Sequence, residues 1–186
     1  MNIALVVPPV KIKEQYGSLS MAAPEMPSLG MAFIAKYLKL RNIEFDFYDF
    51  SLNTKSMDDF FLNIGKYQII GMPVYITTLP DVISFSEAIK DRSPKTIIVA
   101  GGPHSTLFPQ DLFVDGIDLI VKGEGEVSFL EILSQNKTNS LNFSSVKGIY
   151  FRNSFDFIFT GERELLQNLD EVDSPLIDNL NLSMYH

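Results

Sequence analysis

Two glycine-rich turns are the parts of this sequence best suited to hold a ligand. The first, Gly101-Gly102-Pro103-His104-Ser105-Thr106, follows an apolar run over residues 96–100. The second, Gly123-Glu124-Gly125-Glu126, follows another apolar run over residues 117–121. Glycines at the end of a strand let the backbone turn sharply and approach a ligand without a Cβ in the way. Backbone N–H groups in such turns bind phosphate or amide groups, so we expect both turns to line a cofactor site.

The reactive side chains in these turns each allow two interpretations. His104 has the properties of a metal ligand or general base, and equally those of a turn histidine hydrogen-bonded to nearby backbone. Glu124 and Glu126 could form an acid/base pair, or they could stabilise the N-terminus of a helix electrostatically. A Ser/His/Asp triad is excluded, because the chain has two histidines and the second, His186, is its last residue. Hydroxyl groups near the same turns come from Thr77, Thr78, Ser105 and Thr106.

Composition and motifs exclude several other kinds of site. The chain has no cysteine, so it contains no disulfide, no thiolate zinc site and no cysteine-ligated iron–sulfur cluster. Its 15 basic and 23 acidic residues give a net charge of −8, which argues against a nucleic-acid partner because phosphate binding needs clustered Lys and Arg. No G-x-G-x-x-G motif follows the first predicted strand, and no G-x-x-x-x-G-K-S/T motif occurs, so nucleotide-binding folds of those two types fit poorly.

Strands and helices are predicted to alternate along the chain. Apolar or alternating runs predict strands at residues 3–7, 44–50, 67–72, 96–100 and 117–121. Helical patterns are found at residues 28–38, 58–64, 79–91, 109–114 and 127–133. This alternation predicts an α/β fold: a doubly wound, Rossmann-like, five-stranded parallel sheet with helices on both faces.

The C-terminal part of the sequence has a different pattern. Residues 146–151 and 155–159 predict an antiparallel β-hairpin, and an irregular tail follows it. We therefore expect a Rossmann-like domain over residues 1–145, with a hairpin and linker over residues 146–186.

The long loop over residues 8–27 leaves the same edge of the predicted sheet as the glycine turns. The carboxyl ends of parallel strands meet at one edge, where ligands bind in open α/β sheets. Strand-to-helix loops usually have roughly two to six residues. We interpret residues 8–27 as a lid or wall over a site, with a flexible excursion as the alternative. Residues 73–78 form a second long connecting segment that leaves the sheet at this edge.

The sequence also allows a prediction about location. Its first residues lack the basic leader and the long apolar run of a signal peptide. No apolar stretch approaches the roughly 18–20 residues that a membrane span needs. We therefore expect a cytoplasmic protein, with neither a membrane nor a nucleic acid among its partners.

In these motifs and their order, the chain resembles the N-terminal cobalamin-binding domain of cobalamin-dependent radical SAM enzymes. Residues 27–38 resemble the family's opening helix, and the two glycine turns resemble its most recognisable loops. The predicted hairpin and residues 169–175 resemble the lead into the family's catalytic barrel. The resemblance covers nearly the whole chain and implies that the chain binds cobalamin.

The resemblance also implies where the parts of the cofactor lie. The nucleotide tail would be buried among the carboxyl-edge loops, with the corrin ring facing a neighbouring barrel. The first glycine turn and residues 77–78 would line the tail, while the second turn would contact the tail or the corrin side chains through its backbone. Tyr75 and the first loop would lie near the lower face. The implied cofactor contacts are Pro9, Tyr75, Thr77, Thr78, Gly101, Gly102, Pro103, His104, Ser105, Thr106, Gly123, Glu124 and Gly125.

Two departures from the family pattern change what is expected. The D-x-H-x-x-G motif that supplies a cobalt-ligating histidine in methionine-synthase-like domains is absent, so we expect cobalt without a histidine lower ligand. Such a lower face should favour a four-coordinate reduced cobalt that acts as a nucleophile towards a methyl donor. The C-x-x-x-C-x-x-C site that radical SAM chemistry needs is also absent, and the chain stops about where the barrel should begin.

We therefore expect a domain fragment that binds cobalamin and does not catalyse a reaction by itself. The parent would be a radical SAM enzyme, with methyl transfer as its reaction. Its further cofactors would be S-adenosylmethionine and a 4Fe-4S cluster, and its barrel, on the same polypeptide, would be the partner of this domain. Two alternatives stay open: a stand-alone α/β regulatory or interaction domain without a cofactor, and a small α/β enzyme that uses Glu124 or His104 on a polar substrate.

Overall fold

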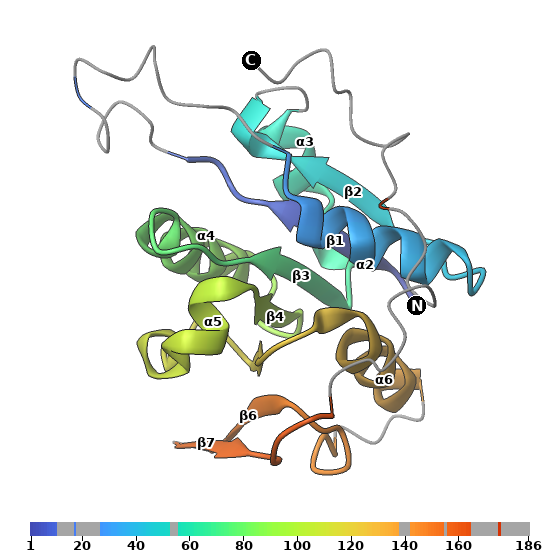
Figure 1. The fold of residues 1–186 in the computed structure, drawn as a ribbon. Helices are drawn as coiled ribbons and strands as arrows, with labels where there is room; N and C mark the ends of the chain where they lie inside the picture. The colour runs from blue at the N-terminus through green and yellow to red at the C-terminus, as the bar shows by residue number, and fades with distance from the viewer. Residues whose placement is uncertain are drawn as a thin grey trace.

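A computed structural model of the chain describes residues 1–10, 17, 27–52, 56–137, 142–154, 156–164 and 175. Its centre is a seven-stranded sheet in the order β2-β1-β3-β4-β5-β6-β7 (Figure 1). The strands are β1 (Ile3–Val7), β2 (Asp46–Asp49), β3 (Ile69–Pro73), β4 (Ile97–Gly101), β5 (Leu119–Val121), β6 (Ile149–Asn153) and β7 (Asp156–Phe159). The α-helices are α2 (Leu29–Lys39), α3 (Met57–Leu62), α4 (Leu79–Arg92), α5 (Pro103–Leu107) and α6 (Gly125–Lys137). Short 3-10 helices are η2 (Phe50–Leu52), η3 (Ile64–Lys66) and η4 (Pro109–Leu112).

The sheet is mostly parallel and is larger than the sequence predicted. Strands β1 to β5 pair with one another in parallel. Strand β6 pairs antiparallel with both β5 and β7, with Ile120 opposite Tyr150. The sequence predicted five parallel strands and a separate hairpin, whereas in the structure the hairpin strands β6 and β7 continue the sheet beyond β5. This pairing covers the backbone edge that β5 would otherwise expose.

Helices cover both faces of the sheet, and the alternation of side chains along β1 shows how (Figure 1). Ile3 and Leu5 belong to the buried cluster that contains residues of α2 and α6. Ala4 and Val6 belong to the opposite cluster, with residues of α3 and α4. Successive side chains of a strand point to opposite faces, so a continuous apolar run such as residues 3–7 can be buried on both.

Two elements near the carboxyl edge differ from the sequence prediction. Residues 103–107 form the short helix α5, where a turn was expected. Pro103 is its first residue, a position where the fixed φ of proline suits a helix and its missing N–H costs nothing. Helix α6 begins at Gly125, earlier than the predicted start at residue 127. Most of the predicted lid (residues 8–27) and of the segment from residue 165 onward lies outside the described residues. Within the part that the structure describes, no helix is both long and apolar enough to cross a membrane.

Candidate functional site

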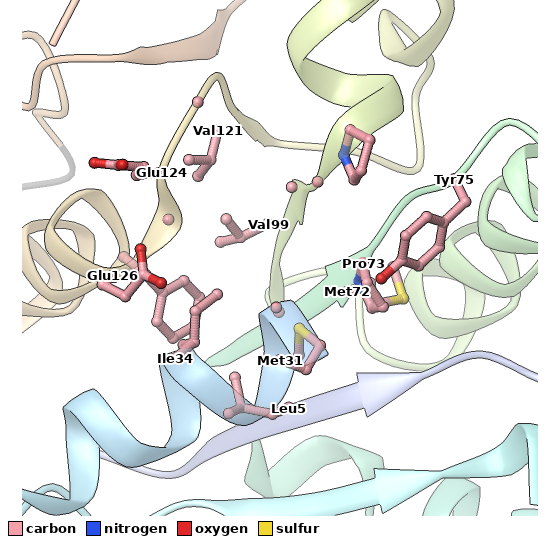
Figure 2. A pocket seen from close by; sticks show the side chains of 18 residues that line it. Leu5, Met31, Ile34, Met72, Pro73, Tyr75, Val99, Val121, Glu124 and Glu126 are labelled. Atoms are coloured by element: carbon pink, nitrogen blue, oxygen red, sulfur yellow. The ribbon is translucent and has the colours of Figure 1, made fainter. Parts of the chain in front are cut away.

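A pocket of about 210 Å³ opens at the carboxyl edge of the sheet, between the N-terminal ends of α2 and α6 (Figure 2). The ends of four parallel strands and the two glycine turns complete its walls. It is lined by Leu5, Gly30, Met31, Ile34, Gly71, Met72, Pro73, Tyr75, Val99, Gly101, Gly102, Pro103, Val121, Gly123, Glu124, Gly125, Glu126 and Phe129.

The floor of the pocket is an apolar row that crosses three strands. Leu5 of β1 pairs in register with Gly71 of β3, which pairs with Val99 of β4. A Cβ on Gly71 would lie 3.0 Å from the Phe129 ring and 3.3 Å from Leu5 Cδ2. Phe129, on α6, is 2% exposed. Glycine at position 71 therefore lets the Phe129 ring lie directly on the sheet, and this contact sets the depth of the pocket.

The first glycine turn needs glycine at one of its two positions. Gly102 has φ 122° and ψ −170°, a conformation that residues with a Cβ rarely adopt. A Cβ there would also lie 2.9 Å from the carbonyl oxygen of Val74. That oxygen accepts a hydrogen bond of 3.2 Å from the N–H of His104, and the N–H of Val74 donates to Gly101 O at 2.7 Å. These hydrogen bonds hold the turn against Val74, in the segment that follows β3.

Thr106 connects the two glycine turns to each other. Its Oγ1 donates to Gly102 O at 2.9 Å and accepts a hydrogen bond of 3.0 Å from the N–H of Gly123. Thr106 was predicted as a direct cofactor contact, but it does not line the pocket between α2 and α6. Its position indicates that it sets the spacing of the two turns that do.

Tyr75 lies at the opposite side of the pocket mouth, in the segment that follows β3 (Figure 2). Its hydroxyl is 3.4 Å from Ser28 Oγ, next to the start of α2. The N–H of Tyr75 donates to Thr78 Oγ1 at 3.1 Å, and that hydroxyl donates to Tyr75 O at 3.3 Å. The predicted contact Thr78 thus holds the turn that carries Tyr75, and neither Thr78 nor Thr77 lines the pocket.

Two acidic residues, Glu124 and Glu126, border the pocket, and their side chains are placed differently. Glu126 lines the pocket from α6, whereas the carboxyl group of Glu124 points away from Val99 and the centre of the pocket (Figure 2). Burial is the main cause that raises the pKa of the Glu126 carboxyl above its ordinary value. Hydrogen bonds from the backbone N–H groups of Glu126 and Gly125 oppose this shift, and the negative charge of Glu124 adds to it. Glu126 therefore accepts a proton more readily than an exposed glutamate does.

The surroundings of the His104 side chain indicate a structural role. Its side chain is 4% exposed, and its Nε2 lies 3.1 Å from Asp111 Oδ2. Its ring packs against Phe108, with the ring centroids 5.5 Å apart. Neither His104 nor the buried Ser105 lines the pocket. Among the described residues, no three His, Cys, Asp or Glu side chains are grouped so that they could hold a metal ion.

The structure divides the predicted contacts into two groups. The residues that line the pocket are Tyr75, Gly101, Gly102, Pro103, Gly123, Glu124 and Gly125. The residues that do not are Pro9, Thr77, Thr78, His104, Ser105 and Thr106.

Sequence reasoning missed the apolar lining of the pocket. The missed residues are Leu5, Gly30, Met31, Ile34, Gly71, Met72, Val99, Val121 and Phe129, whereas Pro73 and Glu126 belong to segments that were expected at this edge. A partial indication was present in the strands, because Leu5, Gly71 and Val99 each precede the end of a strand by two residues. Side chains at equal distances from the ends of parallel strands form a row on one face. The glycine within the third strand was a second indication, since such glycines mark a close approach of another group.

Comparison with known families supplies an independent result. The model of the B12 binding domain family matches residues 19–133. An uncharacterized methyltransferase from Pyrococcus horikoshii is 26% identical over 100% of this chain and 40% of its own length. The cobalamin-dependent radical SAM methyltransferase TokK from Streptomyces tokunonensis is 25% identical over 61% of this chain and 17% of its own length. The chain thus spans less than half the length of these curated relatives.

Solved structures share the fold of this chain. The cobalamin-dependent S-adenosylmethionine radical enzyme OxsB, with aqua-cobalamin and S-adenosylmethionine bound, matches with a TM-score of 0.70 and 21% identity, covering 96% of this chain and 24% of that one. The radical S-adenosylmethionine methyltransferase TsrM from Kitasatospora setae, with cobalamin and a 4Fe-4S cluster bound, matches with a TM-score of 0.67 and 14% identity, covering 93% of this chain and 31% of that one.

Proposed function

The chain belongs to the B12 binding domain family, with cobalamin as its cofactor, and we propose that the pocket between α2 and α6 receives the nucleotide tail of that cofactor. The family match and the relatives confirm the resemblance that the sequence motifs indicated. One observation carries the proposal about the tail: the two glycine turns that resemble the family's loops border a single apolar pocket.

In this proposal the pocket receives the base of the tail and not the whole cofactor. Pockets that enclose a drug-sized ligand have volumes of about 300–1,000 Å³. A cavity of about 210 Å³ instead suits a fused aromatic ring system such as the base of the tail. Its aliphatic walls and the Phe129 ring favour the burial of an aromatic base. Gly30 and Gly123 both line the pocket, and a Cβ at either position would meet no atom within 4 Å, which leaves room for a ligand.

The corrin ring would then lie outside the pocket, against its mouth. We propose that the glycine turns contact the corrin side chains through backbone N–H and C=O groups, at Gly101, Gly102 and residues 123–125. Tyr75, at the mouth, would lie near the lower face. Pro9 and Thr77 stay proposed contacts for parts of the cofactor outside the pocket. We assign His104, Thr78, Ser105 and Thr106 to the support of the turns.

We further propose that cobalt has no histidine lower ligand in this chain. His104 supports this, because its ring is buried, pairs with Asp111 and lies outside the pocket lining. Electron paramagnetic resonance of the chain loaded with cobalamin and reduced to Co(II) tests the proposal. We expect no hyperfine splitting from a nitrogen on cobalt, and such a splitting would refute it.

The relatives support a proposal about a longer parent enzyme and its activity. The named relatives are methyltransferases that are longer than this chain. We propose that the parent is a radical SAM methyltransferase whose barrel follows this domain and binds S-adenosylmethionine and a 4Fe-4S cluster. The division into residues 1–145 and 146–186, and a cytoplasmic location, also stay proposals.

Cobalamin binding is tested with the 186-residue chain and hydroxocobalamin. After incubation and desalting, we expect the visible spectrum of a bound corrinoid. Gly30→Phe should abolish this spectrum, because the new ring would fill the mouth of the pocket. Gly65→Phe is the matched control: a Cβ at Gly65 likewise meets no atom within 4 Å, but Gly65 does not line the pocket. A colourless wild-type protein would favour the cofactor-free alternative. Equal binding by both variants would show that the tail does not enter this pocket.

A further inference from the structure

One ionisable side chain stands out among the residues that line the pocket. Glu126 lies in the first turn of α6, three residues before Phe129, so both side chains share one face of the helix. Glu126 lines the pocket from the α6 side, and Ile34 lines it from α2 (Figure 2). The other two ionisable side chains of the lining are placed differently. Glu124 points away from the pocket, and Tyr75 lies on the far side of the mouth, with its hydroxyl near Ser28 (Figure 2).

The surroundings of Glu126 raise the pKa of its carboxyl group. The aliphatic Ile34 and the Phe129 ring line the same pocket as Glu126. Burial is the main cause of the raised pKa, and hydrogen bonds from the backbone N–H groups of Glu126 and Gly125 oppose it. A ligand that filled the pocket would remove more water from this carboxyl and strengthen the same effect. A protonated carboxyl group is a hydrogen-bond donor, and an ionised one is only an acceptor.

The base at the end of the cobalamin tail carries a hydrogen-bond acceptor that a protonated carboxyl group could pair with. This base is a substituted benzimidazole, whose second ring nitrogen carries a lone pair. When the base lies in a protein pocket, cobalt is not available to that nitrogen. A buried acceptor without a partner is costly, and the aliphatic side chains and the Phe129 ring of the walls cannot pair with it.

We infer that Glu126 is a specificity-determining residue that shares one proton with the free imidazole nitrogen of the tail base. The pocket therefore selects corrinoids whose tail ends in an azole over those whose tail ends in a phenol or is missing. This inference rests on the proposed placement of the tail in the pocket. No bond other than the hydrogen bond forms, and the proton comes from the carboxyl group or the solvent.

The test compares three corrinoids and three variants in the 186-residue chain. The ligands are cobalamin, cresolyl cobamide, whose base has no ring nitrogen, and cobinamide, which has no nucleotide tail. The variants are Glu126→Met, which removes the donor, Glu126→Gln, which keeps an N–H donor of similar shape, and the control Glu87→Met, at an exposed glutamate of α4 that does not line the pocket. Dissociation constants are measured by visible titration, and circular dichroism checks the fold of each variant.

Glu126→Met should weaken cobalamin binding by about tenfold, the effect of one hydrogen bond to a buried acceptor. It should leave the affinities for cresolyl cobamide and cobinamide within about twofold of wild type. Glu126→Gln and Glu87→Met should bind all three ligands nearly as wild type does.

Two results would overturn the inference. An equal loss for cobalamin and cresolyl cobamide in Glu126→Met would mean that Glu126 acts through shape alone. Unchanged affinity for cobalamin in that variant would mean that Glu126 does not contact the base. A wild-type chain that binds none of the three corrinoids would refute the proposed function as well, so the two failures are distinguishable.

Discussion

Arg163, which follows the last strand of the sheet, forms a two-pronged ion pair with Glu131 in the middle of α6. One guanidinium nitrogen lies 3.3 Å from Glu131 Oε1, and the other contacts Glu131 Oε2. The Arg163 Nε donates to Ser128 Oγ at 2.9 Å and to Lys147 O at 3.2 Å. The segment that leaves the sheet is thereby fixed to the helix that forms one wall of the pocket.

We predict that Arg163→Met lowers the free energy of unfolding by about 1–2 kcal/mol. The variant leaves Ser128, Lys147 and Glu131 without their guanidinium partner, and Glu131 is 41% exposed, so water screens part of the loss. Urea unfolding measures the change. A double-mutant cycle with Glu131→Gln should give a coupling energy of about 0.5–1 kcal/mol. A coupling energy of zero would mean that the ion pair does not contribute to stability.

The adjacent glycines of the first turn should respond differently to alanine. Gly102→Ala should destabilise the chain by about 1–3 kcal/mol, because φ 122° strains a residue with a Cβ and the new atom meets Val74 O at 2.9 Å. Gly101→Ala should change stability by less than about 0.5 kcal/mol, since its Cβ makes only an ordinary contact of 3.6 Å with Val121. Thermal unfolding of both variants tests this. Equal destabilisation would contradict the assigned conformation of Gly102.

Alanine at position 71 should disturb both stability and cofactor binding. The added Cβ meets the Phe129 ring at 3.0 Å, so the ring, which lines the pocket, must shift. We expect a loss of about 1–3 kcal/mol from overpacking, together with weaker cobalamin binding. The measurements are urea unfolding and visible titration. Normal cobalamin affinity in a destabilised Gly71→Ala chain would show that the Phe129 ring does not border the bound tail.

The raised pKa of Glu126 predicts how stability depends on pH. A carboxyl whose pKa is higher in the folded than in the unfolded chain binds more protons when folded. Its contribution to stability is therefore full below its unfolded pKa, near 4.5, and is lost as the pH rises through the folded pKa. The neutral variant Glu126→Gln lacks this loss. Its stability relative to wild type should thus increase as the pH rises from about 4 to 8, measured by urea unfolding at several pH values. A constant or decreasing difference would contradict the raised pKa.

Local patterns predicted several elements of the fold closely. Strand β1 spans residues 3–7 as expected, and α4 ends one residue beyond its predicted end. Periodicities of 2 and 3.6 residues belong to the chain itself, so they can be recognised without a tertiary structure. Helix α5 was not recognised, because five residues are too few for a helical period and its sequence looks like a turn. The pairing of β6 with β5 was not predicted either, since the partner of a strand depends on residues far away in the sequence.

The sequence alone determined that glycine turns end two strands at the ligand-binding edge, and that an α/β fold of the cobalamin-binding type presents them. It left His104 with two roles, and only the tertiary structure decided for the structural one, because Asp111 and Phe108 surround the ring. Only the tertiary structure separated Glu126 from Glu124, since the direction of a side chain depends on where its helix begins and what packs beside it. Residues such as Leu5 and Val99 look like ordinary core in the sequence. They become the floor of a pocket because α2 and α6, packed on that face, leave a space between their N-terminal ends.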